Sequence, residues 1–366
     1  MSDTKFYFPP EALPMPHEVR IWNRTIGLSH PTVVIAEIGN NHNGNLKIAR
    51  QLVQAAAYAG ADAVKFQKRV LSEVFTEEML KKPQTSSRQL GTNYGEYRQS
   101  MELSEAELVE LKELAHSLKM AFSVTAFDLE GFKILRRIGM DFWKVASFDV
   151  NHRGLLEAVA DQQQPIFLST GMSTLEERDE AITTITSRNS QLVPLHCVSV
   201  YPTQPKDYNI GAVRTMRKRY RPLPVGYSGH EKGFIPTLVA VALGARVVER
   251  HFTLDTSMPG PDHATVSLDP IEFAEMVRQI RRVEAAVADD RIYLHDGEIQ
   301  HRQKHGKNIV ARVDIAAGTV ITEDLLACKS TGMEGGIKPT LIDTVIGRVA
   351  AIKITKDMMI LEEYLE

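Results

Sequence analysis

Two histidines are the residues of this chain whose type and spacing point most directly to chemistry. His230 ends the β-like run Pro224–His230, and His251 lies near the end of the run Val247–Thr253. Neighbouring parallel strands of an α/β barrel bring such side chains together at their carboxyl ends. Two imidazoles with open coordination positions suit Mn²⁺, Co²⁺, Fe²⁺ or Zn²⁺ acting as a Lewis acid on a carbonyl group. The alternative is that both are unrelated polar residues at loop edges.

The ends of the other apolar runs also carry polar and charged side chains. Core packing would not select lysine, histidine and glutamate there, because burying an uncompensated charge is unfavourable. We therefore expect the strand ends to share one polar cavity. Its candidate residues are Glu37, Lys65, Gln67, Thr125, Lys144, Ser147, Ser169, Thr170, Ser199, Tyr201, Ser228, His230, Glu249 and His251.

Ammonium and hydroxyl groups in this set suit the binding of a phosphate and a carboxylate. No P-loop and no Gly-x-Gly-x-x-Gly follows a strand, so a nucleotide cofactor is not indicated. Asp262 follows the last run and is a candidate for binding a sugar hydroxyl or a metal-bound water, or is a turn aspartate after two prolines. The anion-binding candidates are Lys65, Thr125, Lys144, Ser147, Ser169 and Ser228.

Eight short apolar runs, mostly separated by helix-like segments, must position these side chains. Continuous apolar strands alternating with amphipathic helices predict a parallel sheet covered on both faces, which is the α/β class. Eight repeats favour a (β/α)8 TIM barrel over the alternative, a doubly wound open sheet. The runs are Val33–Ile38, Ala63–Gln67, Ala121–Phe127, Phe142–Ser147, Ile166–Thr170, Leu192–Val198, Pro224–Ser228 and Val247–Thr253.

The patterns predict a barrel over residues 1–290, a polar linker over 291–305 and a small, mostly β domain over 306–366. Within the small domain, Asn308–Val313, Ile315–Thr322 and Val345–Ile354 are predicted as strands. So small a domain is near the lower limit of independent stability, so we expect it to pack on the barrel or on a second chain. The polar segment Leu71–Ser100 lacks periodicity and is predicted as a long functional loop.

Composition sets the broad class of the protein. The chain has 366 residues, 43% of them hydrophobic, and a net charge of −3, so neither a nucleic acid nor a membrane partner is indicated. Cys197 and Cys328 lie in apolar, strand-like contexts and are predicted as buried free thiols. The N-terminus lacks a signal-peptide pattern, and no apolar run approaches the roughly 20 residues that span a bilayer. A soluble cytoplasmic protein is expected.

Several motifs in order resemble the sialic acid (N-acetylneuraminate) synthase family. The segments Gly306–Ala311 and Ile315–Thr322 are similar to that family's C-terminal antifreeze-like (SAF) domain. The barrel motifs are Ala36–Gly44, Ala63–Gln67, Ser169–Met172, Tyr201–Thr203, Gly226–His230 and Glu249–Thr253.

This resemblance implies a transferase that condenses phosphoenolpyruvate (PEP) with N-acetylmannosamine or a related hexosamine, 6-phosphorylated in some members. The products would be a nonulosonic acid and phosphate. It also implies a domain-swapped homodimer, with the SAF domain of one chain over the barrel of the other. By motif match, His230 and His251 would hold Mn²⁺, with Mg²⁺ or Co²⁺ as alternatives.

The resemblance also implies roles for the strand-end residues. Glu37 is the first choice for proton transfer, because a strand-end carboxylate near a metal can assist water or hydroxyl chemistry. Glu249, Asp149 and Tyr201 are the further catalytic candidates. PEP would be held by Lys65, Thr125, Lys144, Ser147, Ser169 and Ser228, and the sugar side of the site would be aligned by Gln67, Ser199 and Asp262.

Some positions depart from the common bacterial pattern of the family. Asp149 stands where many bacterial members have glutamate, and Ser199 where many have asparagine. Both choices resemble the animal-type enzymes, as does the segment Tyr94–Arg98. Since those enzymes take a 6-phosphorylated sugar, Arg98 is a candidate phosphate ligand, or else a solvated loop charge.

Two further departures bear on which sugar is used. Phe148 stands where the family usually has glycine and can reshape the sugar pocket. Ser330 lies near the place of an arginine that reaches the N-acyl group in bacterial members. Sialic-acid, legionaminic-acid and spore-coat-polysaccharide types therefore stay open. A metal-dependent barrel aldolase or 3-deoxy-sugar synthase is the enzymatic alternative, and a carbohydrate- or ice-binding module is the non-enzymatic one.

Overall fold

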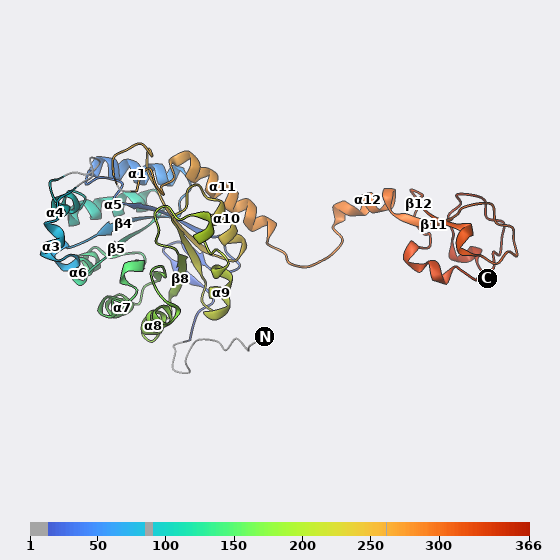
Figure 1. Ribbon diagram of the computed structural model, residues 1–366, viewed down its shortest axis with the longest axis horizontal. Coiled ribbons are helices and arrows are strands. Elements are labelled where there is room, and N and C mark those ends of the chain that lie inside the picture. The colour runs from blue at the N-terminus through green and yellow to red at the C-terminus, as the bar shows by residue number, and fades with distance from the viewer. Residues whose placement is uncertain (1–13, 85–90, 261) are drawn as a thin grey trace. The chain divides into compact units, whose positions relative to one another are not determined.

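The chain forms two compact units, Met1–Ala288 and Asp289–Glu366. The computed structural model describes residues 14–84, 91–260 and 262–366 (Figure 1). The segment predicted as a linker contains a helix, α12 (Asp296–His305), which belongs to the second unit. Its residues are almost all polar, so the sequence has no apolar stripe from which a helix could be predicted.

Eight parallel strands of the described residues form the centre of the first unit, in the order β5-β4-β3-β10-β9-β8-β7-β6. The outer members of this order also adjoin, because the Asp141 N–H donates to the Phe122 carbonyl at 3.2 Å and the Ser123 hydroxyl to the Phe142 carbonyl at 2.6 Å. The predicted barrel is thus confirmed, and the open-sheet alternative is wrong. The strands are β3 (Val33–Gly39), β4 (Ala63–Lys68), β5 (Ala121–Ala126), β6 (Trp143–Val145), β7 (Ile166–Ser169), β8 (Leu192–Cys197), β9 (Gly226–Gly229) and β10 (Val247–His251).

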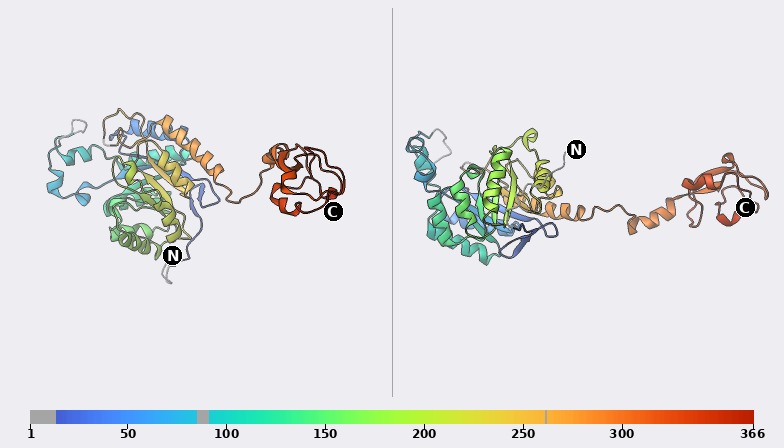
Figure 2. Two further views of the ribbon diagram at one scale, coloured as in Figure 1. Left: turned by 45° about the vertical axis from the view of Figure 1, so that its right-hand side comes forward. Right: turned by 90° about the horizontal axis from the view of Figure 1, so that it is seen from below.

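Helices surround the strands, as the views of Figures 1 and 2 show. The first of them begins where the Asn45 side chain accepts hydrogen bonds from two backbone N–H groups, and it buries a stripe of small and branched side chains against the sheet. The helices are α1 (Leu46–Tyr58), α5 (Glu105–Ser117), α6 (Leu129–Ile138), α7 (Arg153–Ala160), α8 (Leu175–Thr186), α9 (Ala212–Arg219), α10 (Ile235–Ala242) and α11 (Pro270–Ala286). The others likewise bury one face against the sheet, although α7, α9 and α10 begin without a side-chain cap.

The amino-terminal half of the barrel interior is apolar. A hairpin of β1 (Val19–Ile21) and β2 (Arg24–Ile26) packs there against side chains from the beginnings of the strands, including Phe142 and Phe167. Their ring centroids lie 4.7 Å apart. Since this half is filled, the polar side chains of the same strands can meet only at the carboxyl end.

The segment Leu71–Ser100 was predicted as an unstructured loop, and this is wrong for much of it. It contains α2 (Leu71–Val74), α3 (Glu77–Leu80) and α4 (Tyr94–Gln99), while residues 85–90 lie outside the described residues. Each helix is too short to show an apolar stripe. Two of them start at a side-chain cap: the Thr76 hydroxyl accepts from the Met79 N–H at α3, and the Asn93 side chain accepts from the Glu96 N–H at α4.

The second unit has its own apolar core, which includes Ile309, Ile321 and Val345. Its strands are β11 (Lys307–Ala311) and β12 (Leu326–Ser330), paired antiparallel. The predicted strands Ile315–Thr322 and Val345–Ile354 are instead irregular chains joined by isolated bridges. Short 3₁₀ turns complete the described elements: η1 (Ser147–Asp149) and η2 (Pro205–Asp207) in the first unit, and η3 (Glu323–Leu325), η4 (Pro339–Thr344) and η5 (Glu362–Tyr364) in the second.

The prediction for Cys328 is wrong, because this thiol is exposed, whereas Cys197 is buried as expected. Cys328 lies on β12, which buries only its first residue fully, so the apolar context of the sequence did not mean a two-sided core. Among the described residues, the model has no helix that is both long enough and apolar enough to cross a membrane.

Candidate active site

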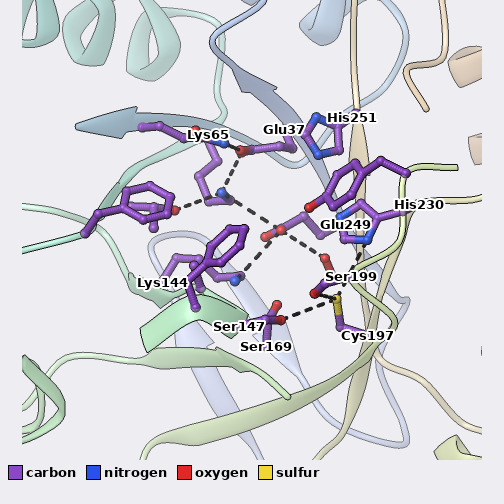
Figure 3. A pocket seen from close by; sticks show the side chains of 17 residues that line it. Glu37, Lys65, Lys144, Ser147, Ser169, Cys197, Ser199, His230, Glu249 and His251 are labelled. Carbon is purple, nitrogen blue, oxygen red and sulfur yellow. Dashed lines mark hydrogen bonds and ion pairs between the residues drawn. The ribbon is translucent and has the colours of Figure 1, made fainter. Parts of the chain in front are cut away.

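A pocket opens at the carboxyl ends of the barrel strands (Figure 3). The predicted strand-end residues converge on it from all eight strands or the turns that follow them. Its lining consists of Glu37, Lys65, Gln67, Thr125, Phe127, Lys144, Ala146, Ser147, Phe148, Ser169, Cys197, Ser199, Tyr201, Ser228, His230, Glu249 and His251.

Lys65 lies at the centre of a buried network on this pocket. Its Nζ is 2.5 Å from Glu37 Oε2 and 3.9 Å from Glu249 Oε1, and it donates to Thr125 Oγ1 at 2.9 Å. Strand pairing dictates this meeting, because Glu37 is in register with Lys65 on β3 and β4 and with His251 on β3 and β10. Gln67 extends the network by donating to Glu37 Oε1 at 2.7 Å.

A second buried ammonium group, that of Lys144, lies 4.0 Å from Glu249 Oε1 and donates to the Val145 carbonyl. Burial lowers the pKa of Lys144 and raises that of Glu37. Burial acts to raise the pKa of Glu249 as well, but the charges of Lys144 and Lys65 outweigh it and hold that pKa below its ordinary value. The ammonium groups of Lys65 and Lys144 thus lie close together beside the carboxylates of Glu37 and Glu249. An anion that enters the pocket can therefore contact both ammonium groups.

His230 and His251 lie next to each other on one side of the pocket, with ring centroids 5.5 Å apart (Figure 3). A carbonyl oxygen only accepts, so His230 Nδ1 must donate to the Val198 carbonyl at 2.9 Å, which leaves Nε2 with a lone pair. His251 Nδ1 is buried without a hydrogen-bond partner. Burial is the main cause that holds the pKa of His251 well below its ordinary value, and a protonated His230 beside it would act in the same direction, so the neutral form of the His251 ring is favoured. Tyr201 packs on His230 with ring centroids 4.1 Å apart.

An ion pair behind the two histidines fixes their positions. Arg250, between Glu249 and His251, points out of the barrel and donates to Glu231 Oε1 and to the Glu231 carbonyl, both at 2.8 Å. Both side chains are fully buried. Because Glu231 follows His230 directly, the pair holds the end of β10 against the end of β9.

Hydroxyl and thiol groups form the wall of the pocket next to His230, whose Nδ1 lies 3.8 Å from Cys197 Sγ. The Ser147 hydroxyl donates to Cys197 Sγ at 3.5 Å and accepts from the Gly171 N–H at 3.1 Å. A side chain at Gly171 would collide with the hydroxyls of Ser147 and Ser199, since its Cβ would lie 2.8 and 2.5 Å from them. Glycine therefore lets the backbone N–H itself serve as a donor in this wall.

Four predicted candidates of the first unit, Asp149, Asp262, Thr170 and Arg98, are not among the lining residues. Asp149 is buried directly after Phe148, and burial raises its pKa to about 7. Asp262 lies beside the pocket with Oδ2 4.0 Å from His251 Nδ1. The Thr170 hydroxyl is not directed to the pocket, because it donates to the Leu195 carbonyl.

The sequence analysis missed Phe127, Ala146 and Cys197 as lining residues. Phe127 lies two positions after Thr125, so the strand period of two could have found it. Cys197 was treated only as a core thiol, although its Sγ is 3.7 Å from Ser199 Oγ. Phe148, the residue predicted to reshape the sugar pocket, does line the pocket and is 59% exposed.

Each of the two units matches the model of a known protein family. Residues 52–291 match the model of the NeuB family, and residues 308–366 match that of the SAF domain.

Curated relatives align over nearly the whole chain. The chain is 36% identical to N-acetylneuraminate-9-phosphate synthase of Homo sapiens, covering 96% of this chain and 98% of that protein. It is 35% identical to N,N'-diacetyllegionaminic acid synthase of Legionella pneumophila, covering 93% and 96%.

A solved structure has the same fold. The N-acetylneuraminic acid (sialic acid) synthetase of Leptospira borgpetersenii, in complex with citrate, superposes with a TM-score of 0.70 at 32% identity. The match covers 79% of this chain and 97% of that chain.

Proposed function

We propose that this chain, which belongs to the NeuB family, condenses PEP with an N-acylated hexosamine to give a nonulosonic acid and inorganic phosphate. Its relatives are named as synthases of sialic and legionaminic acids, which places it among enzymes of this type. The observation that carries the proposal is the pairing of two buried lysines with two adjacent histidines in one pocket.

The lysine side of the pocket suits PEP. Lys65 and Lys144 supply two positive charges, and hydroxyls come from Ser147 after β6, Ser169 on β7 and Ser228 on β9. PEP carries a phosphate and a carboxylate, which such groups recognise. When PEP binds, the lysines exchange their contacts with Glu37 and Glu249 for contacts with its oxygens.

The reaction needs one bond formed, one water added and one bond broken. The methylene carbon of PEP bonds to the aldehyde carbon of the open-chain sugar, and the aldehyde oxygen takes up a proton. Water adds to the former enol carbon, and the tetrahedral centre then loses phosphate. Glu37, held by Lys65 and Gln67 at the join between the two substrates, is placed to move these protons. Tyr201 closes the histidine side of the pocket.

The residues present fit a divalent metal ion held by His230 and His251. Both rings keep a nitrogen lone pair for it, as the Val198 contact and the partnerless His251 Nδ1 indicate. The described residues contain no group of three His, Cys, Asp or Glu side chains placed to hold a metal, so substrate and water would complete its coordination. Such an ion, for which we propose Mn²⁺ with Mg²⁺ or Co²⁺ as alternatives, supplies Lewis-acid polarisation of the sugar aldehyde.

We further propose that the protein acts as a homodimer in which the second unit of one chain covers the barrel of the other chain. The second unit is small and exposes apolar side chains, among them Val320, Met333 and Leu341. Light scattering on the full chain should give twice the chain mass, and a monomeric mass at working concentration would contradict the proposal.

The proposed function is tested by phosphate release from PEP with Mn²⁺ and a panel of aldoses. We expect release with at least one N-acylated hexosamine, its loss with EDTA, and its return with added Mn²⁺. Calorimetry should show Mn²⁺ binding to the wild type that is lost in His230→Ala and His251→Ala. Sugar-dependent condensation from pyruvate, with no phosphate released from PEP, would instead indicate the aldolase alternative.

A further inference from the structure

A second cavity lies at the amino-terminal end of the barrel, away from the active-site pocket. Its volume is about 730 Å³, which is within the usual range for a cavity that holds a small organic ligand. Part of its wall is the segment Arg221–Val225, which leads directly into β9, and another part is Gly244, shortly before β10. In a TIM barrel the reacting groups lie at the opposite, carboxyl-terminal ends of the strands. This cavity therefore has no part in the proposed reaction.

Four cationic side chains, here called the cation cluster, gather on one wall of this cavity. Arg214, Arg217 and Lys218 lie on α9 at spacings of three and four residues, so they share one face of the helix, and Arg221 follows one turn later. Within the described part of the chain, none of these four side chains takes part in a hydrogen bond or an ion pair. In contrast, Arg219, on another side of the same helix, is paired with a carboxylate.

The electrostatics of the helix explain only part of the cation cluster. Basic side chains in the last turn of a helix interact favourably with its dipole, which accounts for Arg217 and Lys218. Arg214 lies in the first turn of α9, where the same dipole disfavours a positive charge, and Arg221 lies beyond the helix. Like charges three and four residues apart also repel each other. The cluster is therefore unfavourable for the protein alone, and a bound anion would stabilise it.

The protein supplies little negative charge to this cavity. Among the described residues that line it, Glu18 is the only acidic one. Its Oε1 accepts from the Ser29 hydroxyl at 3.3 Å and lies 3.0 Å from His30 Nε2. The single carboxylate is thus already engaged, and the cation cluster remains to bind an external anion.

A glycine makes room for one of the cations at the cavity wall. Gly244 has a φ of +102°, and a Cβ there would lie 2.6 Å from Arg217 Nη1 and 2.7 Å from Arg217 Cδ. A side chain at this position would therefore displace the arginine. Because the residue is glycine, the guanidinium can lie across the turn between α10 and β10 and line the cavity.

The rest of the lining is largely apolar. Leu28 lines the cavity and is 58% exposed, and the segment Pro222–Val225 continues the apolar surface. His17 adds an aromatic ring. A ligand that fills both parts must carry concentrated negative charge and a flat, partly apolar body. Phosphate oxygens match the planar fork of arginine, and a nucleobase stacks on histidine rings and guanidinium planes.

We propose that this cavity binds a nucleotide that carries two or three phosphates. The phosphates contact the cation cluster, and the base packs on Leu28 and Pro222–Val225. No P-loop or glycine-rich turn takes part, because side chains supply the donors that backbone N–H groups supply in those motifs. The site is separate from the active-site pocket, so the bound nucleotide is not a substrate of the proposed reaction.

The test is titration calorimetry of the full chain, in EDTA, with ATP, GTP, CTP and UTP. We expect at least one of them to bind, inorganic tripolyphosphate to bind more weakly, and the nucleosides without phosphate to show no binding. Arg217→Gln should weaken nucleotide binding about 10- to 100-fold, as expected for losing a charged hydrogen bond. Binding should also weaken as salt is added, because ions screen exposed charges.

Arg136→Gln is the matched control, because Arg136 is an exposed arginine in the last turn of α6, and it should leave nucleotide affinity unchanged. Arg217→Gln should keep the urea midpoint of the wild type, as well as its kcat and its KM for PEP, because Arg217 is exposed and lies outside the active-site pocket. Calorimetry needs no turnover, so a failure to bind nucleotide leaves the proposed function untouched.

The absence of binding for every nucleotide, even where the polyanion heparin binds, would overturn the proposal. Equal affinity for tripolyphosphate and all four nucleotides would also contradict it, because the apolar surface would then bind no base. An affinity that falls in Lys144→Gln and not in Arg217→Gln would place the nucleotide in the active-site pocket and would likewise overturn the site.

Discussion

Glu37 sits where the two halves of the proposed reaction meet. Its two carboxylate oxygens face different partners, Lys65 on the PEP side and Gln67 on the sugar side. A neutral amide of the same shape would keep the packing but lose both the charge and the ability to exchange a proton.

Glu37→Gln should therefore lower kcat by about 10²- to 10⁴-fold, the usual range for a group that transfers protons. The variant should remain folded and bind Mn²⁺, which circular dichroism and calorimetry check. Steady-state phosphate release is the measurement. Wild-type turnover in this variant would remove Glu37 from the proton-transfer role.

Asp149 gives the barrel a pH dependence of stability. Burial raises its pKa to about 7, above that of an unfolded carboxyl group. Folding therefore favours the protonated carboxyl group. The contribution of Asp149 to the free energy of unfolding is complete at low pH and is lost as the pH rises through 7.

Asp149→Asn removes this titration. Relative to the wild type, the variant should gain about 2–3 kcal/mol in free energy of unfolding between pH 5 and pH 8. Urea unfolding of both proteins at the two pH values measures the gain. A difference that does not change with pH would mean that Asp149 is ionised in the folded protein at pH 5.

At the scale of elements, strand register decides which side chains meet. The pairing of β3 with β4 and with β10 puts Glu37 opposite both Lys65 and His251. Outside the barrel, Glu231 is bound by Arg250, Tyr227 and Thr237, which ties β9, β10 and α10 together.

Glu231→Gln should destabilise the barrel by about 3–5 kcal/mol, because it leaves Arg250 buried without its counter-charge. It should also weaken Mn²⁺ binding, since the ends of β9 and β10 carry the two histidines. Urea unfolding and calorimetry measure the two effects. The exposed control Glu176→Gln should change stability by no more than about 0.5 kcal/mol. Unchanged Mn²⁺ affinity in a destabilised Glu231 variant would mean that the ion pair supports the fold alone.

At the scale of the whole molecule, the chain is two cores joined by an exposed segment. The barrel core and the core of the second unit are separate clusters. Between them, residues 285–300 are exposed, and the Arg291 side chain is 77% exposed.

Brief trypsin treatment should therefore cut first at Arg291 and yield two protected fragments, since exposed connecting backbone is the preferred site of proteolysis. Mass spectrometry of the fragments identifies the cut. Early cleavage inside β3–β10, with Arg291 intact, would contradict this division of the chain.

How much the sequence determined is clearest in the barrel. Apolar runs of the right length predicted all eight strands within about two residues, because a strand buried on both faces must be continuously apolar. The same logic predicted that charged residues at strand ends share a cavity, and Glu37, Lys65, Lys144, His230, Glu249 and His251 do line one pocket. It failed for the second unit, where irregular chain carries a similar apolar content, and for Cys328, whose burial depends on which face of β12 is covered.

Only the tertiary structure decided which polar side chains pair. Lys65 and Glu249 are distant in sequence, and they lie within 3.9 Å because β4 and β10 both pair with β3. Nothing in the sequence around Arg69 singles it out, and only the fold shows that it is buried with an Nη1 that has no hydrogen-bond partner. The physical reason is that the spacing of apolar residues along one segment can be read directly from the sequence. The partner of a buried charge, in contrast, lies on a segment that is distant in the sequence and becomes a neighbour only in the folded chain.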